Sequence, residues 1–422
     1  MPHFRSLSFL IFMVRFGSLV GLLLVLSGCG VEGKPTNVEP LDKVLYSGPA
    51  PEGLSSCDGF QVVSIEPGQT AKEAIVSHLA AEGKTLNDVA FYEQNRRIKA
   101  PSEKFTELTQ VPQRVQGMGV SVSSSLTVNR QAVVAVTDGG VDVNHIELKD
   151  WIYVNSGEIP GNGIDDDGNG FIDDVNGYSF APNNGGSSVQ DTNNHGTHVS
   201  GIVKRTAEAL GMSSSDLKIM PVKFMNTGSD GTLEGALRSI GYAVRNGADV
   251  INASWGSYGY SEFLDHCVQA AVAEGVTFVA AAGNGINGTG VNNDSYPIWP
   301  ARVTGAISVA AIMSVGGNLT SFSNYGVGSV HLGALGYQIE STIPGNQYGV
   351  MSGTSMAAPA VAGAVATLIA TADSKPTTSE ITTSLVQGAA ANTYLAGKVI
   401  SGGELSYSGS KTVLDSIQST LP

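Results

Sequence analysis

The chain has 422 residues, a net charge of −14 and 53 glycines. This length suits one large domain with additional segments rather than one small domain. The acidic balance argues against nucleic acid and anionic membrane surfaces as electrostatic partners, and it fits an exported protein or one that binds cations. Three cysteines in such a length also argue against a disulfide scaffold.

The N-terminus has the layout of a signal peptide. Arg5 and Arg15 give it a weakly basic start, and residues 16–26 form a short apolar core. The alternative is a transmembrane anchor, but this apolar run is too short to cross about 30 Å of hydrocarbon comfortably. We therefore expect a signal peptide over residues 1–28.

The end of the apolar core, Leu26-Ser27-Gly28-Cys29, resembles the bacterial lipobox. The resemblance implies cleavage before Cys29 and acylation of its sulfur, so that lipid chains hold the mature N-terminus in a bilayer. Gly30, rather than Asp, follows the cysteine, which by the same resemblance favours the outer membrane of a Gram-negative cell. The expected location is therefore the cell envelope, with release after processing as an alternative.

Residues 29–58 contain Pro, Gly and Ser, show little periodicity, and are predicted to form a tether. The pattern then changes. Residues 60–65 alternate like a strand, residues 70–81 have apolar positions at helical spacing, and residues 89–92 suggest a second strand. Residues 59–105 are thus predicted to form a small α+β segment.

From residue 131 onward, apolar β-rich runs alternate with helical stretches. This alternation predicts an α/β fold in which helices cover both faces of a parallel sheet, and we assign residues 106–422 to it. Strands are expected at residues 132–137, 250–253, 276–281 and 306–311, and helices at residues 232–246 and 261–274.

Two polar segments of this region carry groups typical of catalysis. Asp138 and two glycines follow an apolar strand, and active-site groups of open α/β sheets collect at the carboxyl ends of strands. Taken alone, Asp-Gly-Gly could equally be a polar turn. His195 opens the run His-Gly-Thr-His-Val-Ser-Gly, which begins a helix of small residues. We reject zinc binding there, because the histidine spacing is not the helical i, i+4 spacing and no Glu accompanies it.

Two further segments end in groups that suit acyl transfer. Asn284 follows an apolar strand, and its side-chain amide can donate to a developing oxyanion without carrying a charge, although it could also be a turn residue. Ser355 lies in Gly-Thr-Ser-Met-Ala-Ala-Pro at a predicted helix start. Small neighbours leave its hydroxyl reachable, and the helix start leaves its backbone N–H unpaired.

Together, these four segments resemble the subtilisin family of serine peptidases over roughly residues 110–400. The strings His-Gly-Thr-His-Val-x-Gly and Gly-Thr-Ser-Met-Ala-Ala-Pro-x-Val-Ala-Gly are long and rarely accidental. The chain order Asp, His, Ser is the subtilisin order and differs from those of chymotrypsin-like and α/β-hydrolase enzymes. The resemblance implies a subtilisin-like fold and an endopeptidase that cleaves proteins or peptides through an acyl-enzyme intermediate.

The resemblance also assigns roles to residues. Ser355 is the nucleophile, His195 the general base and then acid, and Asp138 the residue that orients the imidazole. The side chain of Asn284 and the N–H of Ser355 form the oxyanion hole. The stretch Ser254-Trp255-Gly256 resembles the segment that pairs with the substrate backbone and forms one wall of the specificity pocket, the alternative being a sheet-edge turn.

The α+β segment at residues 59–105 resembles, in shape and position only, the pro-segment that precedes many subtilisin-like enzymes. An unrelated accessory segment is the alternative. We expect a processing site between about Arg96 and Ser125. The enzyme is expected to be a monomer that binds no nucleic acid and meets the membrane through its lipid.

The chain departs from the family pattern at three places. Gly139 stands where the family usually has Ser or Thr, so a hydroxyl beside the carboxylate of Asp138 is missing. Ile146 stands where Pro is common. Residues 201–212 lack the Asn-rich loop that often binds calcium, so we do not expect that calcium site here.

A different acidic loop, at residues 162–174, has oxygen-bearing side chains at alternate positions and a Gly for the turn. It resembles an EF-hand loop and predicts a structural calcium ion, the alternative being a solvated acidic loop. The bidentate Glu that closes an EF-hand loop is missing, and Asn176 stands in its place. The expected ligands are Asp165, Asp167, Asn169, the carbonyl of Phe171, and Asp173.

Two cysteines remain once Cys29 is acylated. Cys57 and Cys267 could pair in an oxidising compartment, which would keep the α+β segment attached after a processing cut. The alternative is two separate thiols.

A competing function is a lipoprotein that keeps the fold for structure or binding without turnover. All four catalytic positions are filled, which argues against this function. Gly139 is the only feature that favours it. A lipase or esterase is poorly supported, because it would require a different order of the catalytic residues.

Overall fold

The computed structural model describes residues 40–47, 57, 60–86, 89, 91–99, 104–108, 126–227 and 229–420. The predicted signal peptide and Cys29 lie outside the described residues. We call the described residues from 40 to 99 the N-terminal segment, and those from 126 to 420 the large domain.

The helices are α1 (Ala71–Ala81), α2 (His195–Ala209), α3 (Leu233–Arg245), α4 (Glu262–Ala273), α5 (Thr354–Thr371), α6 (Thr378–Gln387), α7 (Tyr407–Ser419) and the short 3₁₀ helix η2 (Lys149–Trp151). The strands of the N-terminal segment and its connection are β1 (Pro40–Ser47), β2 (Gln61–Ser64), β3 (Phe91–Lys99) and β4 (Lys104–Leu108). Those of the large domain are β5 (Ala132–Asp138), β6 (Tyr178–Ala181), β7 (Asn184–Gly186), β8 (Leu217–Lys223), β9 (Met225–Asn226), β10 (Asp230–Thr232), β11 (Val250–Ala253), β12 (Ser257–Tyr258), β13 (Thr277–Ala281), β14 (Ile298–Trp299), β15 (Ile307–Ile312), β16 (Leu332–Leu335), β17 (Ile339–Ile343), β18 (Gln347–Ser352), β19 (Ala390–Ala391) and β20 (Gly403–Glu404).

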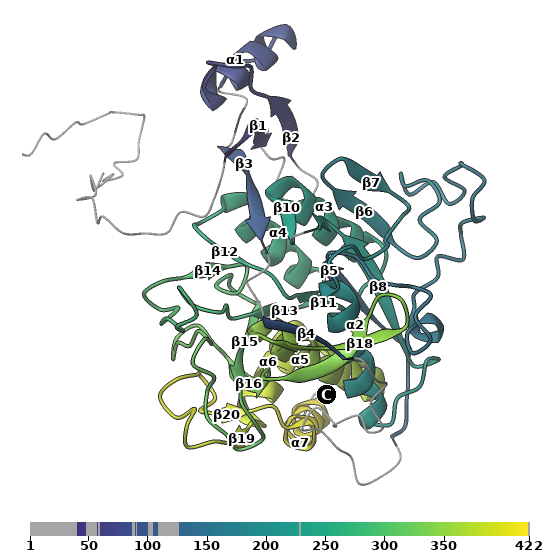
Figure 1. Ribbon diagram of the computed structural model, residues 1–422, viewed down its shortest axis with the longest axis vertical. Coiled ribbons are helices and arrows are strands. Elements are labelled where there is room, and N and C mark those ends of the chain that lie inside the picture. Colours follow the sequence, from purple (N-terminus) through teal and green to yellow (C-terminus); the bar gives the residue numbers. More distant parts are fainter. Residues whose placement is uncertain are drawn as a thin grey trace, which may run out of the picture. The chain divides into compact units, whose positions relative to one another are not determined.

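A ten-stranded sheet forms the centre of the large domain (Figure 1). Its strand order is β19-β20-β16-β15-β13-β11-β5-β8-β6-β7, and every pair from β20 to β6 is parallel. Only the outermost strands β7 and β19 join antiparallel. The predicted α/β fold with a parallel sheet is therefore confirmed.

Helices cover both faces of this sheet, as the near-continuous apolar strands predicted. Because successive side chains of a strand point to opposite faces, Val134 and Val136 pack with α2 and α5, whereas Ala135 packs with α3 and α4. Every residue of α5 is buried. Within the described part of the chain, α5 is the one helix long and apolar enough to cross a membrane, and it lies wholly inside this core.

The N-terminal segment has a small core of its own. Side chains of β1 and α1, among them Val44, Ile75 and Leu79, pack together, and Thr70 caps α1 in a reciprocal pair with Glu73. The strand–helix–strand order agrees with the sequence prediction. However, β1 lies within the stretch that we expected to be a tether, and its regular structure comes from pairing with β2 and β3 rather than from any local periodicity.

The N-terminal segment and its connection add strands to the large domain. Strand β3 pairs antiparallel with β10, with Lys99 opposite Asp230. Strand β4 pairs antiparallel with β18, with Lys104 opposite Ser352 (Figure 1). The boundary that we expected at residues 105 and 106 thus falls inside β4.

A disulfide bond joins Cys57 to Cys267 on α4, across 210 residues of sequence. Of the two alternatives that the sequence left open, the structure has the pair. The N-terminal segment is therefore linked to the large domain by a disulfide bond as well as by the peptide chain.

Candidate active site

Asp138 and His195 meet at the carboxyl end of the central sheet. Asp138 is the last residue of β5, and His195 is the first residue of α2. The Nδ1 atom of His195 lies 2.8 Å from Oδ1 and 2.9 Å from Oδ2 of the fully buried Asp138. A carboxylate in this position fixes the tautomer and the orientation of the imidazole, leaving Nε2 for proton transfer.

A second buried carboxylate, Asp191, holds the start of α2. Its Oδ2 accepts the N–H of Thr197 at 2.9 Å and the hydroxyl of the same residue at 2.6 Å. Asn194, the capping residue of α2, makes no side-chain cap. Asp191 therefore supplies the acceptor that the first turn needs, and its negative charge suits the positive end of the helix dipole. Burial raises the pKa of Asp191, and the hydrogen bonds from Thr197 oppose that rise.

A buried lysine lies beside these two carboxylates. Lys223 is fully buried opposite Asp138 in the sheet, and its Nζ donates to the backbone oxygens of Gly139 and, at 2.8 Å, Met225. Burial lowers the pKa of Lys223, while the charges of Asp191 and Asp138 raise it. No local motif points to Lys223, because its role depends on strand pairing.

The structure gives a physical reason for Gly139. A Cβ at this position would lie 2.4 Å from Nδ2 and 2.5 Å from Oδ1 of Asn193. The Asn193 side chain accepts the N–H of His195 at 3.0 Å and donates to the backbone oxygen of Asn226 at 3.3 Å. Asn193 thus occupies the space that a Ser or Thr side chain would need.

Asn284 is held by the residue that precedes Ser355. Its Oδ1 accepts the backbone N–H of Thr354 at 2.8 Å and the Thr354 hydroxyl at 2.9 Å. Its Nδ2 is buried and has no hydrogen-bond partner among the described residues. An unsatisfied buried donor is costly, so an amide fixed in this way is poised to bind an incoming oxygen.

Ser355 is linked to Ser254 by two hydrogen bonds. The Ser355 hydroxyl donates to the backbone oxygen of Ser254 at 3.1 Å, and the Ser254 hydroxyl donates to the backbone oxygen of Ser355 at 2.9 Å. Pro359 explains the second bond. It lies one turn after Ser355 within α5 and lacks the N–H that would otherwise bond the Ser355 oxygen. Ser254 replaces that missing donor.

Trp255 and Gly256 follow at the end of β11. The Trp255 side chain is completely buried against Phe224, and its Nε1 donates to the hydroxyl of Thr137 at 3.0 Å. Gly256 lies close to Ile298. Contacts between this stretch and a substrate would therefore come from the backbone rather than from the indole.

The second histidine of the His-Gly-Thr-His run is a structural residue. Nε2 of His198 lies 3.0 Å from the backbone oxygen of Ile339 and 3.1 Å from that of Gly349. Burial lowers the pKa of His198 to about 3. A neutral imidazole therefore joins α2 to β17 and β18, the hairpin that precedes Ser355.

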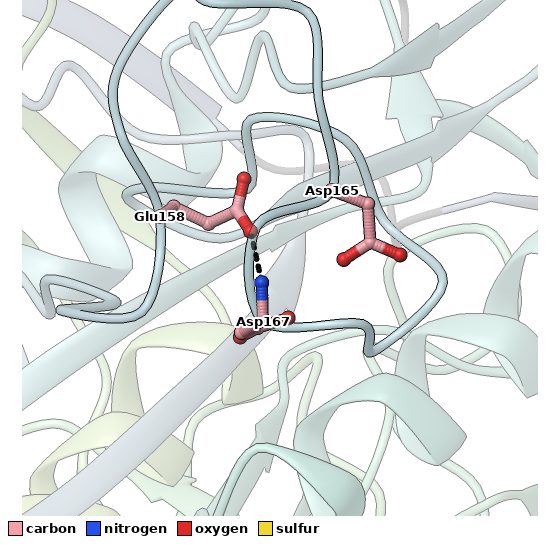
Figure 2. Close-up of side chains that lie close together, drawn as sticks. All are labelled: Glu158, Asp165 and Asp167. Carbon is pink, nitrogen blue, oxygen red and sulfur yellow. Dashed lines mark hydrogen bonds between the residues drawn. The ribbon is translucent and has the colours of Figure 1, made fainter.

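Three carboxylates gather at the acidic loop, two from within it and one from just before it, as Figure 2 shows. Glu158, Asp165 and Asp167 each offer an oxygen atom within 4.8 Å of the others. Oε1 of the buried Glu158 also accepts the N–H of Asp166 at 2.8 Å and that of Asp167 at 3.2 Å. A cluster of hard oxygen donors with like charges fits Ca²⁺, which offsets their mutual repulsion.

Asp165 and Asp173 take different places in this loop. The Asp165 carboxylate accepts backbone N–H groups from Gly168 at 2.8 Å and Gly170 at 2.8 Å, so the chain curls around it. Asp173 has a positive φ of 53°, and its carboxylate accepts backbone N–H groups of the turn at residues 161–163. Contrary to expectation, Asp173 therefore lies outside the carboxylate cluster, and Glu158, which was not among the expected ligands, belongs to it.

The other expected ligands lie around the cluster. Nδ2 of Asn169 donates to Asp167 at 3.2 Å and to Asp174 at 3.0 Å, and Oδ1 of Asn169 accepts the N–H of Phe171 at 2.8 Å. The Phe171 ring packs against Tyr242. A hydrogen bond from Asn155 holds the pKa of Asp167 below its usual value, so this carboxylate stays ionised.

The comparison with protein families agrees with this geometry. The model of the subtilase family matches residues 129–408, which include all four catalytic candidates. The chain belongs to the subtilase family.

Its relatives include several proteases. It is 34% identical over 243 residues to "Subtilisin-like protease 2" of Plasmodium falciparum (isolate 3D7), a match that covers 56% of this chain and 17% of the relative. It is 37% identical over 238 residues to "Thermophilic serine proteinase" of Bacillus sp. (strain AK1), covering 56% of this chain and 51% of the relative. It is 37% identical over 190 residues to "Subtilisin Savinase" of Lederbergia lenta, covering 44% of this chain and 66% of the relative. The matches thus span less than two thirds of the length of these relatives.

A solved structure shows the same fold. Fervidolysin from Fervidobacterium pennivorans, described as a keratinolytic enzyme related to subtilisin, matches with a TM-score of 0.66 and 21% sequence identity. The match covers 90% of this chain and 62% of that chain. The match supports the α/β fold over most of this chain.

The contact between Gly139 and Asn193 predicts a reciprocal mutational effect. In a Ser355→Ala background, Gly139→Ser should lower the free energy of unfolding by about 1–3 kcal/mol, because the new side chain overpacks the site. Adding Asn193→Ala should recover part of this loss, although Asn193→Ala alone is destabilising. Urea denaturation of the four proteins measures the coupling. Additive effects would show that Asn193 does not exclude the family's hydroxyl residue.

Proposed function

We propose that this protein is an exported serine endopeptidase that hydrolyses peptide bonds in proteins or peptides. The observation that carries the proposal is the buried Nδ2 of Asn284, which has no partner among the described residues and is held beside Ser355 through Thr354. A neutral donor fixed beside a serine hydroxyl is what the oxyanion hole of an acyl-transfer enzyme requires. Membership of the subtilase family and the contact of His195 with Asp138 support the same conclusion.

Each group has a defined task in the proposed reaction. The Ser355 hydroxyl turns from the Ser254 carbonyl to Nε2 of His195, which takes its proton as the oxygen attacks the scissile carbonyl. Asp138 stabilises the resulting imidazolium. Asn284 and the N–H of Ser355 bind the oxyanion, and His195 passes the proton to the leaving amine. Water then hydrolyses the acyl-enzyme by the same steps.

The catalytic proposal is tested by active-site labelling. A fluorophosphonate should label the enzyme freed of its N-terminal segment, and Ser355→Ala should abolish the labelling. Asn284→Ala should remain folded and lose about 10²–10³ in kcat on a peptide substrate, because one oxyanion donor is gone. Asn318→Ala, an exposed amide substitution, is the control and should have no effect. Absence of labelling in the freed wild type would instead favour a binding lipoprotein without turnover.

We also propose that the N-terminal segment is a pro-segment and that the processing cut falls between β3 and β4. Strand β4 pairs with β18, whose last residue Ser352 lies three positions before Ser355. Strand β3 pairs with β10. In the chain, β10 follows shortly after β8, and the last residue of β8 pairs with Asp138. The chain therefore passes from a strand on the Asp138 side to the strand that leads into Ser355, as a bound substrate would.

A structural calcium ion in the acidic loop is part of the proposal. Glu158, Asp165 and Asp167 would hold it, with further oxygens from the loop. The ion would neutralise the cluster and fix a loop whose aromatic residue Phe171 packs onto α3 through Tyr242. Its role is stability, since none of these groups belongs to the catalytic constellation.

Removal of calcium should therefore lower the melting temperature. For the Ser355→Ala protein, calcium at 100 times its Kd should add about 2.7 kcal/mol to the free energy of unfolding, and excess chelator should remove it. Asp165→Asn should abolish this difference, whereas Asp415→Asn, on the exposed side of α7, should preserve it. Differential scanning calorimetry measures the shift. Equal melting temperatures with chelator and with excess calcium would contradict the site.

Export and lipidation at Cys29 complete the proposal. The lipobox-like sequence supports acylation. The Cys57–Cys267 disulfide supports an oxidising compartment, because such bonds are rare in the cytosol. The expected place is the outer membrane of a Gram-negative cell, where the enzyme acts as a monomer.

Metabolic labelling tests the lipid. In a Gram-negative host, an alkyne-bearing fatty acid should label the wild type and should not label Cys29→Ser. A variant with both Cys57→Ser and Cys267→Ser should keep the label, which would locate it on Cys29. Recovery of the wild type from the soluble periplasmic fraction without label would refute the anchor.

A further inference from the structure

The Cys57–Cys267 disulfide crosses the proposed processing cut. Cys57 lies before β2 in the N-terminal segment, and Cys267 lies on α4 of the large domain. We propose that this bond keeps the N-terminal segment on the enzyme after the cut, so that the processed protein is a two-chain molecule with β3 still in place. This inference rests on the proposed function. The retained segment would regulate the proposed active site and keep the processed enzyme at the membrane.

The disulfide lies in an apolar core shared by both parts. Cys57 and Cys267 are 6% and 3% exposed. Leu45 of β1 and Ile98 of β3 belong to the same core as Leu237 and Leu264 from α3 and α4. Thiol–disulfide exchange requires that a thiolate reach a sulfur atom, so burial protects this bond from dissolved reductants. The link is therefore durable rather than a readily switched bond.

Polar contacts hold β3 on the same surface. The guanidinium of Arg96 donates to the backbone oxygens of Tyr260 at 3.0 Å and Gly259 at 3.1 Å. The carboxylate of Glu93 accepts the hydroxyl of Ser261 at 2.8 Å, and Ser261 also caps α4, the helix that carries Cys267. The disulfide and the strand thus fasten to the same helix.

A second set of contacts fastens β3 to α3. Asn95 is 1% exposed, its Oδ1 accepts the N–H of Glu234 at 3.1 Å, and its Nδ2 donates to the Glu234 carboxylate at 3.3 Å. The backbone of β3 pairs with β10 over Arg97–Lys99. Arg97 also forms an ion pair with Asp230. None of these contacts involves the proposed cut, so all of them survive it.

Covalent retention changes the fate of the cut segment. Without the bond, only non-covalent contacts would hold β3, and the segment would be diluted whenever it dissociates, whereas a tether keeps its effective concentration in the millimolar range. Under the proposed function, in which the chain around the cut lies as a bound substrate would, the strand then continues to compete with substrate. Inhibition ends only after a second cut between Cys57 and Phe91, which frees β3. Even then, the peptide from Cys29 to Cys57 would still join the lipid to the catalytic domain through the disulfide.

The first experiment compares the wild type with a variant carrying both Cys57→Ser and Cys267→Ser. After processing, the wild type should run as one species in denaturing, non-reducing gels. Dithiothreitol should convert it to two, since this dithiol supplies the two electrons and two protons that turn the bond into two thiols. The double variant should give two species without reductant. A wild type that separates into two chains without reductant would overturn the proposal.

Membrane fractionation gives the second readout. The catalytic fragment of the processed wild type should remain with the membranes, and that of the double variant should appear in the supernatant. Fluorophosphonate labelling of the processed double variant should exceed that of the wild type on the order of 10²-fold, because its inhibitor strand can leave. Equal labelling would show that β3 does not restrain the tethered enzyme. Unchanged circular dichroism confirms that the variant folds.

A third arm separates this inference from the proposed function. In Ser355→Ala, residues 100–103 are replaced by a flexibly flanked recognition sequence for a site-specific protease, which cuts the chain without catalysis by the enzyme. Gel filtration without reductant should then keep the two fragments together, and the double cysteine variant should release the N-terminal fragment. Failure of self-cleavage with success of this arm would reject the processing proposal alone. Loss of the fragment with the cysteines intact would reject the tether.

Discussion

The first turn of α5 depends on side chains from two neighbouring strand ends, because the helix backbone cannot provide all the hydrogen-bond partners that this turn needs. Pro359 lacks the N–H that would bond the Ser355 oxygen, and Ser254 after β11 supplies a hydroxyl instead. Thr354, at the helix start, binds Asn284 after β13. The nucleophile candidate and the oxyanion donor are therefore positioned by one set of bonds. A helix that began with ordinary capping would hold neither strand end in register with Ser355.

The other half of the site is organised by buried charge. Two carboxylates, Asp138 and Asp191, are nearly inaccessible to water, and each alone would carry a large desolvation cost. Lys223 lies beside them on the neighbouring strand, and the helix dipole of α2 favours Asp191. Backbone and side-chain donors fill the remaining positions. The contact between Asp138 and His195 thus rests on an electrostatically balanced environment rather than on a single ion pair.

Local sequence predicted what depends on local pattern. Apolar runs predicted the parallel strands and the helices between them. The four catalytic candidates lie in sequence motifs that can be recognised without a structure. Asp191, Lys223 and Thr354 were missed, since their partners are set by strand order and helix packing. Glu158 precedes the EF-hand-like spacing and joins the cluster only because the loop folds back onto it. The pairing of Cys57 with Cys267 stayed open for the same reason, because 210 residues separate them.

The N-terminal segment and its connection cover strand edges that would otherwise be exposed. Exposed edges are a general problem for a protease that is proposed to bind its substrate as an extended strand. Such an enzyme must keep strand edges open for substrate, yet an open strand edge also invites pairing with other chains. Here β3 covers β10 and β4 covers β18, and both strands come from the chain itself. Backbone pairing thus covers both edges, and it is the kind of interaction that the proposed function assigns to substrate. Under the proposed tether, an extended peptide would have to displace β3 from its backbone pairing and its side-chain contacts, and the disulfide would set how strong that competition must be.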